Sequence, residues 1–288
     1  IARALHGKST QSIGLIVPTV ALPFFGELTE YVEDFLAEHG YRTFVCNSMG
    51  KADRERDYLD LLVSHRVDGI VSSAHNDGLA DYGSIHLPVV SVDRDLSPTV
   101  PNVRCDNEAG GRLAAEHLLK RGARRPALLT SRTGIHNLRE KGYRQVLQQA
   151  GIEPVVLTVD FNTPNGERPG LIRERLDLVA DDIDAVFATD DLAAAQVMEW
   201  AAERDLRIPD DFKVIGFDGT IAMQHALPAL TTIQQPIANL ARAAVDLLLN
   251  RIESATAVSS ENKQQGEPWK DLQAPSPMPV RLLPGRTA

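Results

Sequence analysis

Short apolar runs alternate with segments of helical periodicity almost to the end of this chain, and the alternation occurs in two blocks. The apolar runs have the length of buried strands, and the segments between them repeat apolar residues at the spacing of one helix face. Buried strands separated by helices are typical of parallel sheets that helices cover on both faces. We therefore predict an α/β fold with two doubly wound, Rossmann-like lobes.

The two blocks are similar in size. The first has predicted strands at residues 13–17, 42–46, 69–72 and 89–92 and helices at 25–38 and 52–65. The second has predicted strands at 125–129, 155–159, 185–188, 213–217 and 231–233 and helices at 108–121, 138–150, 167–179 and 191–204. A helix at 236–251, an aperiodic Ser-, Gln- and Pro-rich segment at 254–279 and a last strand at 279–283 follow. We predict that the aperiodic segment is a mobile surface loop.

Composition argues against several classes of protein. The net charge of −9 is unlike that of a basic nucleic-acid-binding domain. No run of about 18 apolar residues occurs, so neither a transmembrane helix nor a membrane partner is predicted. The eight His show no zinc-type spacing, so we expect no metal. Cys46 and Cys105 are expected to be buried thiols, and their separation neither supports nor excludes a disulfide.

Sequence motifs for common enzymes and cofactors are missing as well. No G-x-G-x-x-G follows the first predicted strand, and no P-loop motif or G-x-S-x-G elbow occurs. The acidic pairs at 181–182, 190–191 and 210–211 are interpreted as helix caps and turn residues rather than catalytic dyads. We therefore expect no cofactor and no catalytic residues.

Chemically varied side chains follow the ends of predicted strands in both blocks. Ligands of open α/β sheets bind outside the carboxyl ends of the strands. Asp accepts hydrogen bonds from hydroxyls, Arg donates in a fixed fork, and an aromatic face packs on the C–H face of a sugar ring. This mixture suits a sugar or another polyol. The candidate ligand-binding residues are Phe24, Phe25, Asp93, Arg94, Arg139, Phe161, Thr189, Asp190, Asp218 and Gln235.

Each of these residues also has a structural interpretation. Asp93, Asp190 and Asp218 have the residue type and position of simple helix N-caps. The two adjacent Phe residues suit the core, and Arg139 suits a solvated helix face. The shared location of the whole set at strand ends favours a ligand site.

Six short motifs occur in a fixed order along the chain. They are Ile13-Gly14-Leu15-Ile16-Val17-Pro18, Pro23-Phe24-Phe25, Asp68-Gly69-Ile70, Phe187-Ala188-Thr189-Asp190-Asp191-Leu192-Ala193-Ala194, Gly216-Phe217-Asp218 and Thr231-Thr232-Ile233-Gln234-Gln235-Pro236. In this order and spacing the chain resembles the LacI/GalR family of bacterial transcription regulators over nearly its whole length. The resemblance implies a type I periplasmic-binding-protein-like core, in which two lobes are joined by three crossings of the chain.

The same resemblance implies where the lobes begin and end. We expect an N-terminal lobe from 11–106 and 235–254, a C-terminal lobe from 107–234 and 278–288, and a mobile loop at 255–277. Residues 1–10 are expected to be the remnant of a hinge helix and linker.

The expected ligand site is most similar to that of ribose operon repressors and the related periplasmic ribose-binding protein. The aromatic pair, the Asp93-Arg94 pair and the acid and amide at Asp218 and Gln235 match that pattern. Two positions depart from it, because Leu22 and Thr189 stand where the pattern has Asn. Each change removes an amide that both donates and accepts hydrogen bonds. The expected effector is therefore ribose, another pentose or a related polyol.

The residues before the first strand resemble the second half of the family's hinge helix. In the family this helix enters the DNA minor groove, and Leu5 matches its intercalating leucine. The resemblance implies a cytoplasmic homodimer that binds operator DNA through this hinge and a helix-turn-helix headpiece upstream of Ile1. An ordinary terminal segment is the structural alternative for residues 1–8. Two other functions stay open, a periplasmic sugar-binding protein of a transporter and a sugar-processing enzyme.

Overall fold

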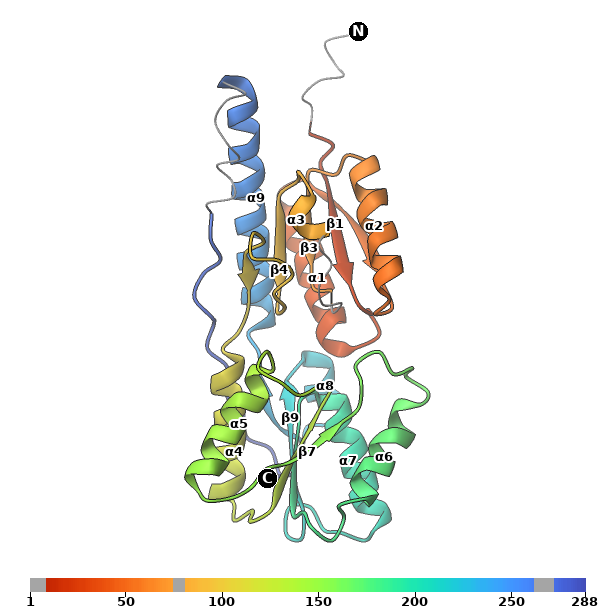
Figure 1. Cartoon of the computed structure of the whole chain (residues 1–288), viewed down its shortest axis with the longest axis vertical. Coiled ribbons are helices and arrows are strands. Elements are labelled where there is room, and N and C mark those ends of the chain that lie inside the picture. The colour runs from red at the N-terminus through yellow and green to blue at the C-terminus, as the bar shows by residue number, and fades with distance from the viewer. Residues whose placement is uncertain (1–8, 75–80, 262–271) are drawn as a thin grey trace. The chain divides into compact units, whose positions relative to one another are not determined.

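A computed structural model describes residues 9–74, 81–261 and 272–288 of the chain (Figure 1). The predicted hinge residues 1–8, with Leu5, and residues 262–271 of the predicted loop lie outside the described residues. The chain divides into two compact units. The first comprises the described residues up to Arg104 and those of Ile237–Met278, and the second comprises Cys105–Pro236 and Pro279–Ala288. The predicted boundaries after residues 106 and 234 and before 278 differ from these by one or two residues.

The first unit is built on a five-stranded parallel sheet in the order β2-β1-β3-β4-β5. Its central strands are mostly apolar, and β1, β3 and β4 are buried along their whole length. The strands are β1 (Ser12–Val17), β2 (Arg42–Asn47), β3 (Gly69–Ser72), β4 (Val89–Val92) and β5 (Asn102–Val103). Because all five run in the same direction, their carboxyl ends meet at one edge of the sheet.

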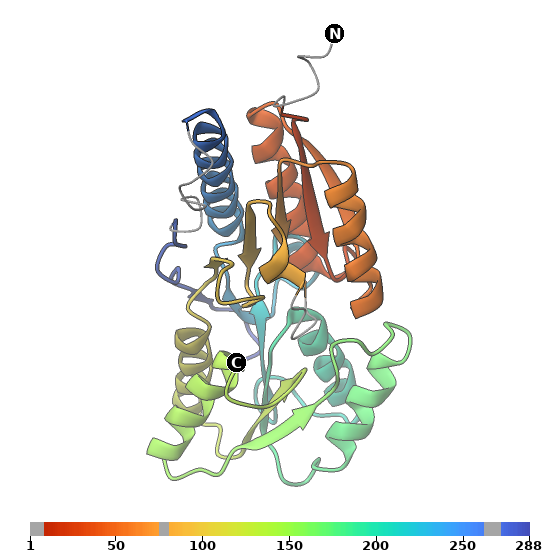
Figure 2. The same ribbon diagram turned by 45° about the horizontal axis from the view of Figure 1, so that its top comes forward.

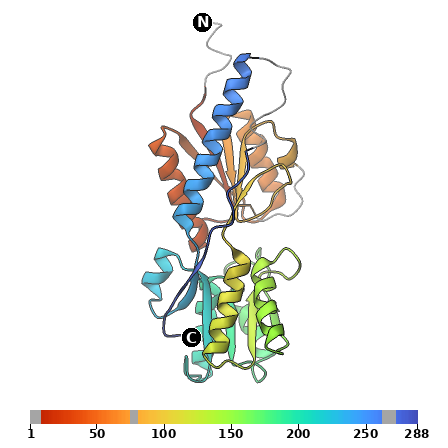
Figure 3. The ribbon, with the colours of Figure 1, turned by 90° about the vertical axis from the view of Figure 1, so that its left-hand side faces the viewer.

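Helices cover both faces of this sheet. They are α1 (Pro23–Glu38), α2 (Ala52–Ser64), α3 (Asp81–Ser84) and α9 (Ile237–Glu261). The helices α1 and α9 pack on each other, and α9 also contacts β3, β4 and β5; Figure 3 shows α9 running along this unit. On the other face, Leu59 and Leu62 of α2 and Tyr82 of α3 join Ile16 and Ile70 in an apolar core.

The helix α9 is longer than predicted. The sequence indicated a helix ending at Arg251 and a loop from residue 255, but α9 continues to Glu261. Beyond Ile252 the apolar stripe stops, so periodicity no longer marks the helix. Extending an existing helix adds one hydrogen bond per residue without a new nucleation cost, and the hydroxyl of Ser254 donates back to Asn250 O at 2.8 Å. The predicted start of the loop was therefore wrong.

The second unit is built on a six-stranded sheet in the order β11-β10-β9-β8-β6-β7. All pairs are parallel except β10 with β11. The strands are β6 (Pro126–Thr130), β7 (Val155–Thr158), β8 (Ala185–Ala188), β9 (Lys213–Asp218), β10 (Thr231–Gln234) and β11 (Arg281–Leu283). As in the first unit, the carboxyl ends of the parallel strands lie at one edge.

Helices flank this sheet on both sides (Figure 2). They are α4 (Asn107–Lys120), α5 (Leu138–Gln149), α6 (Arg168–Asp177), α7 (Asp191–Glu203) and the short α8 (Ile221–Ala226). Side chains of α6 and α7, with Trp200 the largest, form one apolar core, and those of α4 and α5 form the other around Tyr143 and Phe187. The prediction of two doubly wound α/β lobes is confirmed.

Glycines bring α4 and α5 into close contact. A Cβ atom built on Gly111 would overlap the backbone carbonyl of Arg139, and one on Gly142 would overlap that of Glu108. Only glycine permits this approach of two helix backbones. The contact holds the first turn of α5, which carries Arg139, directly against the first turns of α4.

Three short elements were not predicted, namely α3, α8 and β5. Each is too short for a periodic pattern to indicate it. The buried state predicted for Cys46 and Cys105 is confirmed, and both are free thiols. Across the described ranges, no helix has the length and apolar character needed to span a bilayer.

Candidate functional site

Five candidate residues follow parallel strands of the second unit, at the edge where the carboxyl ends meet. Asp218 ends β9, Thr189 and Asp190 follow β8, and Gln235 follows β10. Arg139 comes from the first turn of α5, after β6. Hydrogen bonds and an ion pair connect Arg139 with Asp218, Gln235 with Asp218, and Arg139 with the backbone oxygen of Thr189.

Arg139 lies at the centre of this group. Its Nε donates to Asn107 Oδ1 at 2.7 Å, and its Nη1 donates to the backbone oxygen of Thr189 at 2.7 Å. The same Nη1 lies 3.8 Å from Asp218 Oδ1, and the guanidinium carbon lies 3.7 Å from the centroid of the Phe217 ring. The guanidinium is therefore held in one orientation by contacts on several sides. The interpretation of Arg139 as a solvated helix residue is wrong.

Asp218 forms the second half of this charge pair, and its side chain is only 13% exposed. Burial raises the pKa of its carboxyl well above the ordinary value, against the opposing effect of the Arg139 charge. Gln235 Nε2 donates to Asp218 Oδ1 at 2.8 Å, and Cys105 Sγ donates to Gln235 Oε1 at 3.0 Å. The thiol thus fixes the amide so that its nitrogen faces the carboxylate.

Asp190 is both a helix cap and an ion-pair partner. Its Oδ1 accepts from the backbone N–H of Ala193 at 2.7 Å, which makes it the N-cap of α7. Its Oδ2 accepts from Arg168 Nη2 at 2.9 Å. The capping interpretation of Asp190 is confirmed, and the ion pair adds a second arginine at this edge of the sheet.

Asp191, which was interpreted only as a cap or turn residue, is buried in the same region with 2% exposure. It accepts hydrogen bonds from the Thr232 hydroxyl at 2.6 Å and from the backbone N–H of Gly219 at 2.8 Å. Burial raises the pKa of its carboxyl to about 7, although these two hydrogen bonds oppose the shift. The cap interpretation fails for Asp191 because its neighbour Asp190 is the N-cap.

Phe161 is the remaining candidate of the second unit. It lies half-buried in the turn that follows β7. Its position after a strand matches the sequence expectation.

The first unit presents its candidate residues at the carboxyl edge of its own sheet. Phe24 and Phe25 lie in the first turn of α1, which follows β1 after a short loop and starts at Pro23. Both rings are buried, with 5.1 Å between their centroids in an edge-to-face arrangement. The burial of both rings agrees with the interpretation of these residues as part of the core. Leu22 is the N-cap residue of α1 and makes no side-chain capping bond.

Asp93 and Arg94 follow β4 and are half-buried. Asp93 has a φ of 70°, and its backbone N–H donates to Val103 O at 2.9 Å. A left-handed backbone is uncommon for residues other than glycine, although Asp tolerates it better than most. The chain therefore turns at Asp93 and leaves the direction of β4. Neither Asp93 nor Arg94 caps a described helix.

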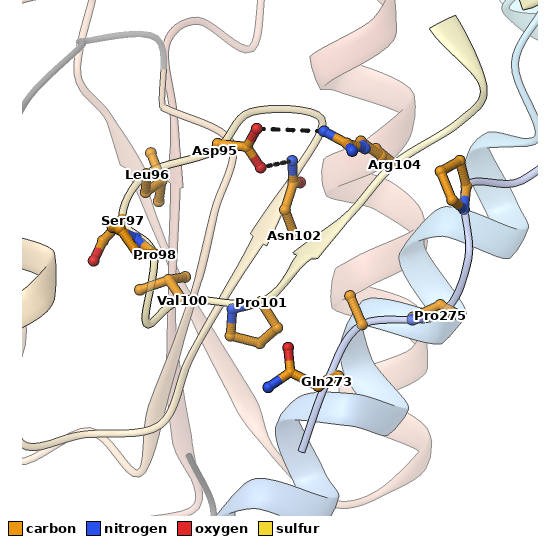
Figure 4. Close-up of a pocket in the computed structure, with 12 residues that line it drawn as sticks. Asp95, Leu96, Ser97, Pro98, Val100, Pro101, Asn102, Arg104, Gln273 and Pro275 are labelled. Atoms are coloured by element: carbon orange, nitrogen blue, oxygen red, sulfur yellow. Dashed lines mark hydrogen bonds and ion pairs between the residues drawn. The ribbon is translucent and has the colours of Figure 1, made fainter. Parts of the chain in front are cut away.

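A separate pocket of about 560 Å³ lies within the first unit (Figure 4). It is lined by the loop after β4, by β5 and by residues 273–277, and none of the candidate ligand residues lines it. Asp95 crosses its upper part, accepting from Asn102 Nδ2 at 2.8 Å and from Arg104 Nη1 at 3.3 Å. Asp95 is thus paired with Asn102 Nδ2 and with Arg104.

Sequence reasoning missed several residues that hold the second-unit group together. Asn107 and Cys105 lie just after the first passage between the units, where no strand end pointed to them. Thr232 lies inside a strand, and Arg168 begins α6 after a long loop. The sequence signal that was available is the Asp190-Asp191 pair. A helix needs only one N-cap residue, so the second acid of the pair indicated a further role. Among the described residues, no group of three or more His, Cys, Asp or Glu side chains is arranged to hold a metal ion.

Comparison with known proteins gives the class and the family. A family model described as a periplasmic binding protein-like domain matches residues 115–267. The chain is 39% identical over 260 residues to a sucrose operon repressor of Streptococcus mutans serotype c, covering 88% of this chain and 78% of that one. It is 33% identical over 255 residues to a ribose operon repressor of Halalkalibacterium halodurans, covering 88% and 76%.

Structural comparison agrees. The crystal structure of a periplasmic binding protein/LacI transcriptional regulator from Alkaliphilus metalliredigens, complexed with D-xylulofuranose, matches with a TM-score of 0.81. The two chains are 28% identical, and the match covers 97% of this chain and 99% of the other. Two wound lobes with polar residues at the strand ends define a periplasmic-binding-protein-like core. Within that class, the chain belongs to the LacI/GalR family of transcriptional regulators.

Proposed function

We propose that this chain is the effector-binding and dimerisation core of a LacI-type repressor and that its effector is a sugar or a related polyol. The carrying observation is the group formed by Arg139, Asp218 and Gln235. It combines a fixed donor, a carboxylate acceptor and an amide in a partly buried position. The remaining proposed ligand contacts are Phe24, Phe25, Asp93, Arg94, Phe161, Thr189 and Asp190.

The chemistry of this group suits hydroxyl recognition. Asp218 is an acceptor for sugar hydroxyls, and Arg139 donates to ring or hydroxyl oxygens. Because Asn107 and Thr189 O hold the guanidinium beforehand, little side-chain entropy remains to be lost when a ligand binds. We propose that the chain acts by binding and coupling rather than by catalysis.

The sequence relatives support a regulator rather than a transport protein, since those compared above are named as operon repressors. We therefore propose a cytoplasmic protein whose operator DNA contacts are made by the hinge around Leu5 and by a helix-turn-helix headpiece. Effector and DNA would be linked through a coupling free energy between two sites. A hundredfold change in DNA affinity requires about 2.7 kcal/mol of differential effector binding.

The identity of the sugar is the first test of this proposal. The relatives are named for sucrose and ribose, and the matching crystal structure holds D-xylulofuranose. Leu22 and Thr189 each remove an amide from the ribose pattern, and a hydrogen bond left unmade costs about 1–3 kcal/mol. We expect at least one of D-ribose, D-xylulose, D-fructose and sucrose to raise the melting temperature of the chain in a thermal-shift titration, by linkage. If none of these sugars or their phosphates shifts the melting temperature at millimolar concentration, the effector proposal is wrong.

We also propose that the chain forms a homodimer through the edge of the first unit's sheet. The strand β2 is an edge strand, and its adjacent residues Phe44 and Val45 are 47% and 45% exposed. An edge strand with exposed apolar side chains on both faces favours association with another chain.

Replacing Phe44 by Asp tests this interface. We expect Phe44→Asp to weaken the dimer by tenfold or more (~1.4 kcal/mol), because burying an unpaired carboxylate opposes association. Sedimentation velocity over a concentration series measures the effect. Leu178→Asp is the matched control, since Leu178 is 69% exposed in the second unit. A wild-type monomer would exclude the homodimer, and an unchanged dimer in Phe44→Asp would exclude this edge as its interface.

A further inference from the structure

The turn that carries Asp218 has an unusual backbone. Asp218 has a φ of 103° and the next residue, Gly219, a φ of 59°. Glycine adopts such angles freely, but for an Asp they are unfavourable and must be maintained by surrounding contacts. The direction in which the Asp218 carboxylate points therefore depends on whatever holds this turn.

Asp191 provides the side-chain contact to the backbone N–H of this turn. Its Oδ2 accepts the N–H of Gly219 at 2.8 Å, and its Oδ1 accepts the hydroxyl of Thr232 on the neighbouring strand β10 at 2.6 Å. One carboxylate thus connects the start of α7 to the end of β9 and to β10. Because β9 and β10 carry Asp218 and lead to Gln235, the carboxylate lies behind both proposed sugar contacts.

The neighbouring strand leaves room for this carboxylate. A Cβ atom built on Gly216 would overlap Asp191 Oδ1, so any larger residue there would displace it. Gly216 has an ordinary strand position in β9 and no positive φ. Its small size is therefore explained by the close approach of Asp191.

Capping of α7 does not explain Asp191, because the side chain of Asp190 already caps that helix. Its burial is electrostatically costly, as the pKa of its carboxyl indicates, which is raised by burial and further by the nearby charge of Asp190. A buried acid at such a position is expected to have a specific structural task. The positive end of the α7 dipole offsets part of this cost.

We propose that Asp191 is a positioning residue for effector binding, which holds the Asp218–Gly219 turn so that the Asp218 carboxylate and the Gln235 amide face the sugar. This inference rests on the proposed function of the site. It differs from a merely structural role, in which Asp191 would stabilise the unit without affecting the turn.

The test compares Asp191→Ala, Asp191→Asn and Thr232→Val, using whichever of D-ribose, D-xylulose, D-fructose and sucrose binds the wild-type chain best. We expect Asp191→Ala to lower the sugar affinity about 10- to 100-fold by calorimetry, the range for a lost hydrogen bond to a charged group. Asp191→Asn keeps an acceptor for Gly219 and should recover the affinity to within about threefold. Thr232→Val removes only the hydroxyl and keeps the Gly219 bond, so its loss should be smaller than that of Asp191→Ala.

Hydrogen exchange of the ligand-free protein gives a second readout, in a peptide that spans Gly216 to Thr220. We expect faster exchange in Asp191→Ala and near-normal exchange in Asp191→Asn. An affinity unchanged in Asp191→Ala, an Asn variant as weak as the Ala variant, or unchanged exchange in the Ala variant would each overturn the positioning role. If Asp191→Ala does not fold, the other two variants decide. The positioning role would be overturned if Thr232→Val kept normal sugar affinity while Asp191→Asn lost sugar affinity. If the wild type binds no sugar, the proposed function fails, and the exchange data alone decide whether Asp191 holds the turn.

Discussion

Asp218→Ala is expected to reduce sugar affinity by about 100-fold or more while the chain stays folded. The substitution removes the carboxylate acceptor and leaves Arg139, 3.8 Å away, without its counter-charge beside the ligand. It also removes the acceptor that orients the Gln235 amide. The pKa of Asp218 is raised by burial, so its removal relieves a desolvation cost that offsets the strain of Ala at a positive φ.

Calorimetric titration with the best-binding sugar, together with a thermal melt, measures both parts of this expectation. Asp218→Asn keeps the shape and an acceptor, so we expect an intermediate loss of about tenfold. Asp182→Ala is the matched control, since Asp182 is exposed in the same unit and should leave the affinity unchanged. A folded Asp218→Ala variant that binds sugar as tightly as the wild type would remove the central residue from the proposed site.

The second large effect concerns pH. In the folded chain the pKa of Asp191 is raised to about 7 from the ordinary 3.8, mainly by burial. Between these two values the folded state retains a proton that the unfolded state has lost. The stability associated with this proton is fully present below about pH 4 and is lost as pH rises through about 7. The linked change in the free energy of unfolding is on the order of 1 kcal/mol per pH unit.

Urea unfolding of wild type and Asp191→Asn, between about pH 5 and 8, tests the sign and the window. The Asn variant should gain stability relative to wild type as pH rises, with the difference levelling off above about pH 7. The charges that face Asp191 are those of Asp190, Arg139 and Asp218, and all of them remain in the variant. Asp211→Asn is the control: the pKa of Asp211 is lowered to about 2 by Arg207, so its contribution should not change over this range. A constant difference between Asp191→Asn and wild type would show that Asp191 titrates normally.

The regular elements could be predicted because local patterns define them. The strands β3, β4 and β8 are mostly apolar and buried along their whole length, and periodicity indicated the helices between the strands. The end of α9 was wrong because its last turns have no apolar stripe, and the bonds that continue a helix leave no mark on sequence pattern. The predicted hinge residue Leu5 lies outside the described residues, so its DNA role stays a prediction.

The candidate site was also predictable only in part. Position after a strand was enough to select Arg139, Asp218 and Gln235, because parallel strands bring their carboxyl ends to one edge. Position after a strand did not distinguish the role of Asp190 from that of Asp191. Asp190 is the N-cap and has an extended backbone, whereas Asp191 is the first residue of the helix, so the two side chains point in different directions. Asp190 reaches Arg168, and Asp191 lies buried. Only the packing of α7 on the sheet decides which is which.

By itself, the sequence determined the α/β class, the two lobes and the kinds of side chain available at each strand end, since these depend on periodicity and residue type. Tertiary structure decided which of those side chains meet. Cys105 and Gln235 are 130 positions apart and are joined only by the folded sheet, and Gly111 meets Arg139 only because two helices touch. Burial then raised the pKa of the Asp191 and Asp218 carboxyls, because the cost of a charge depends on how much water the fold removes from it.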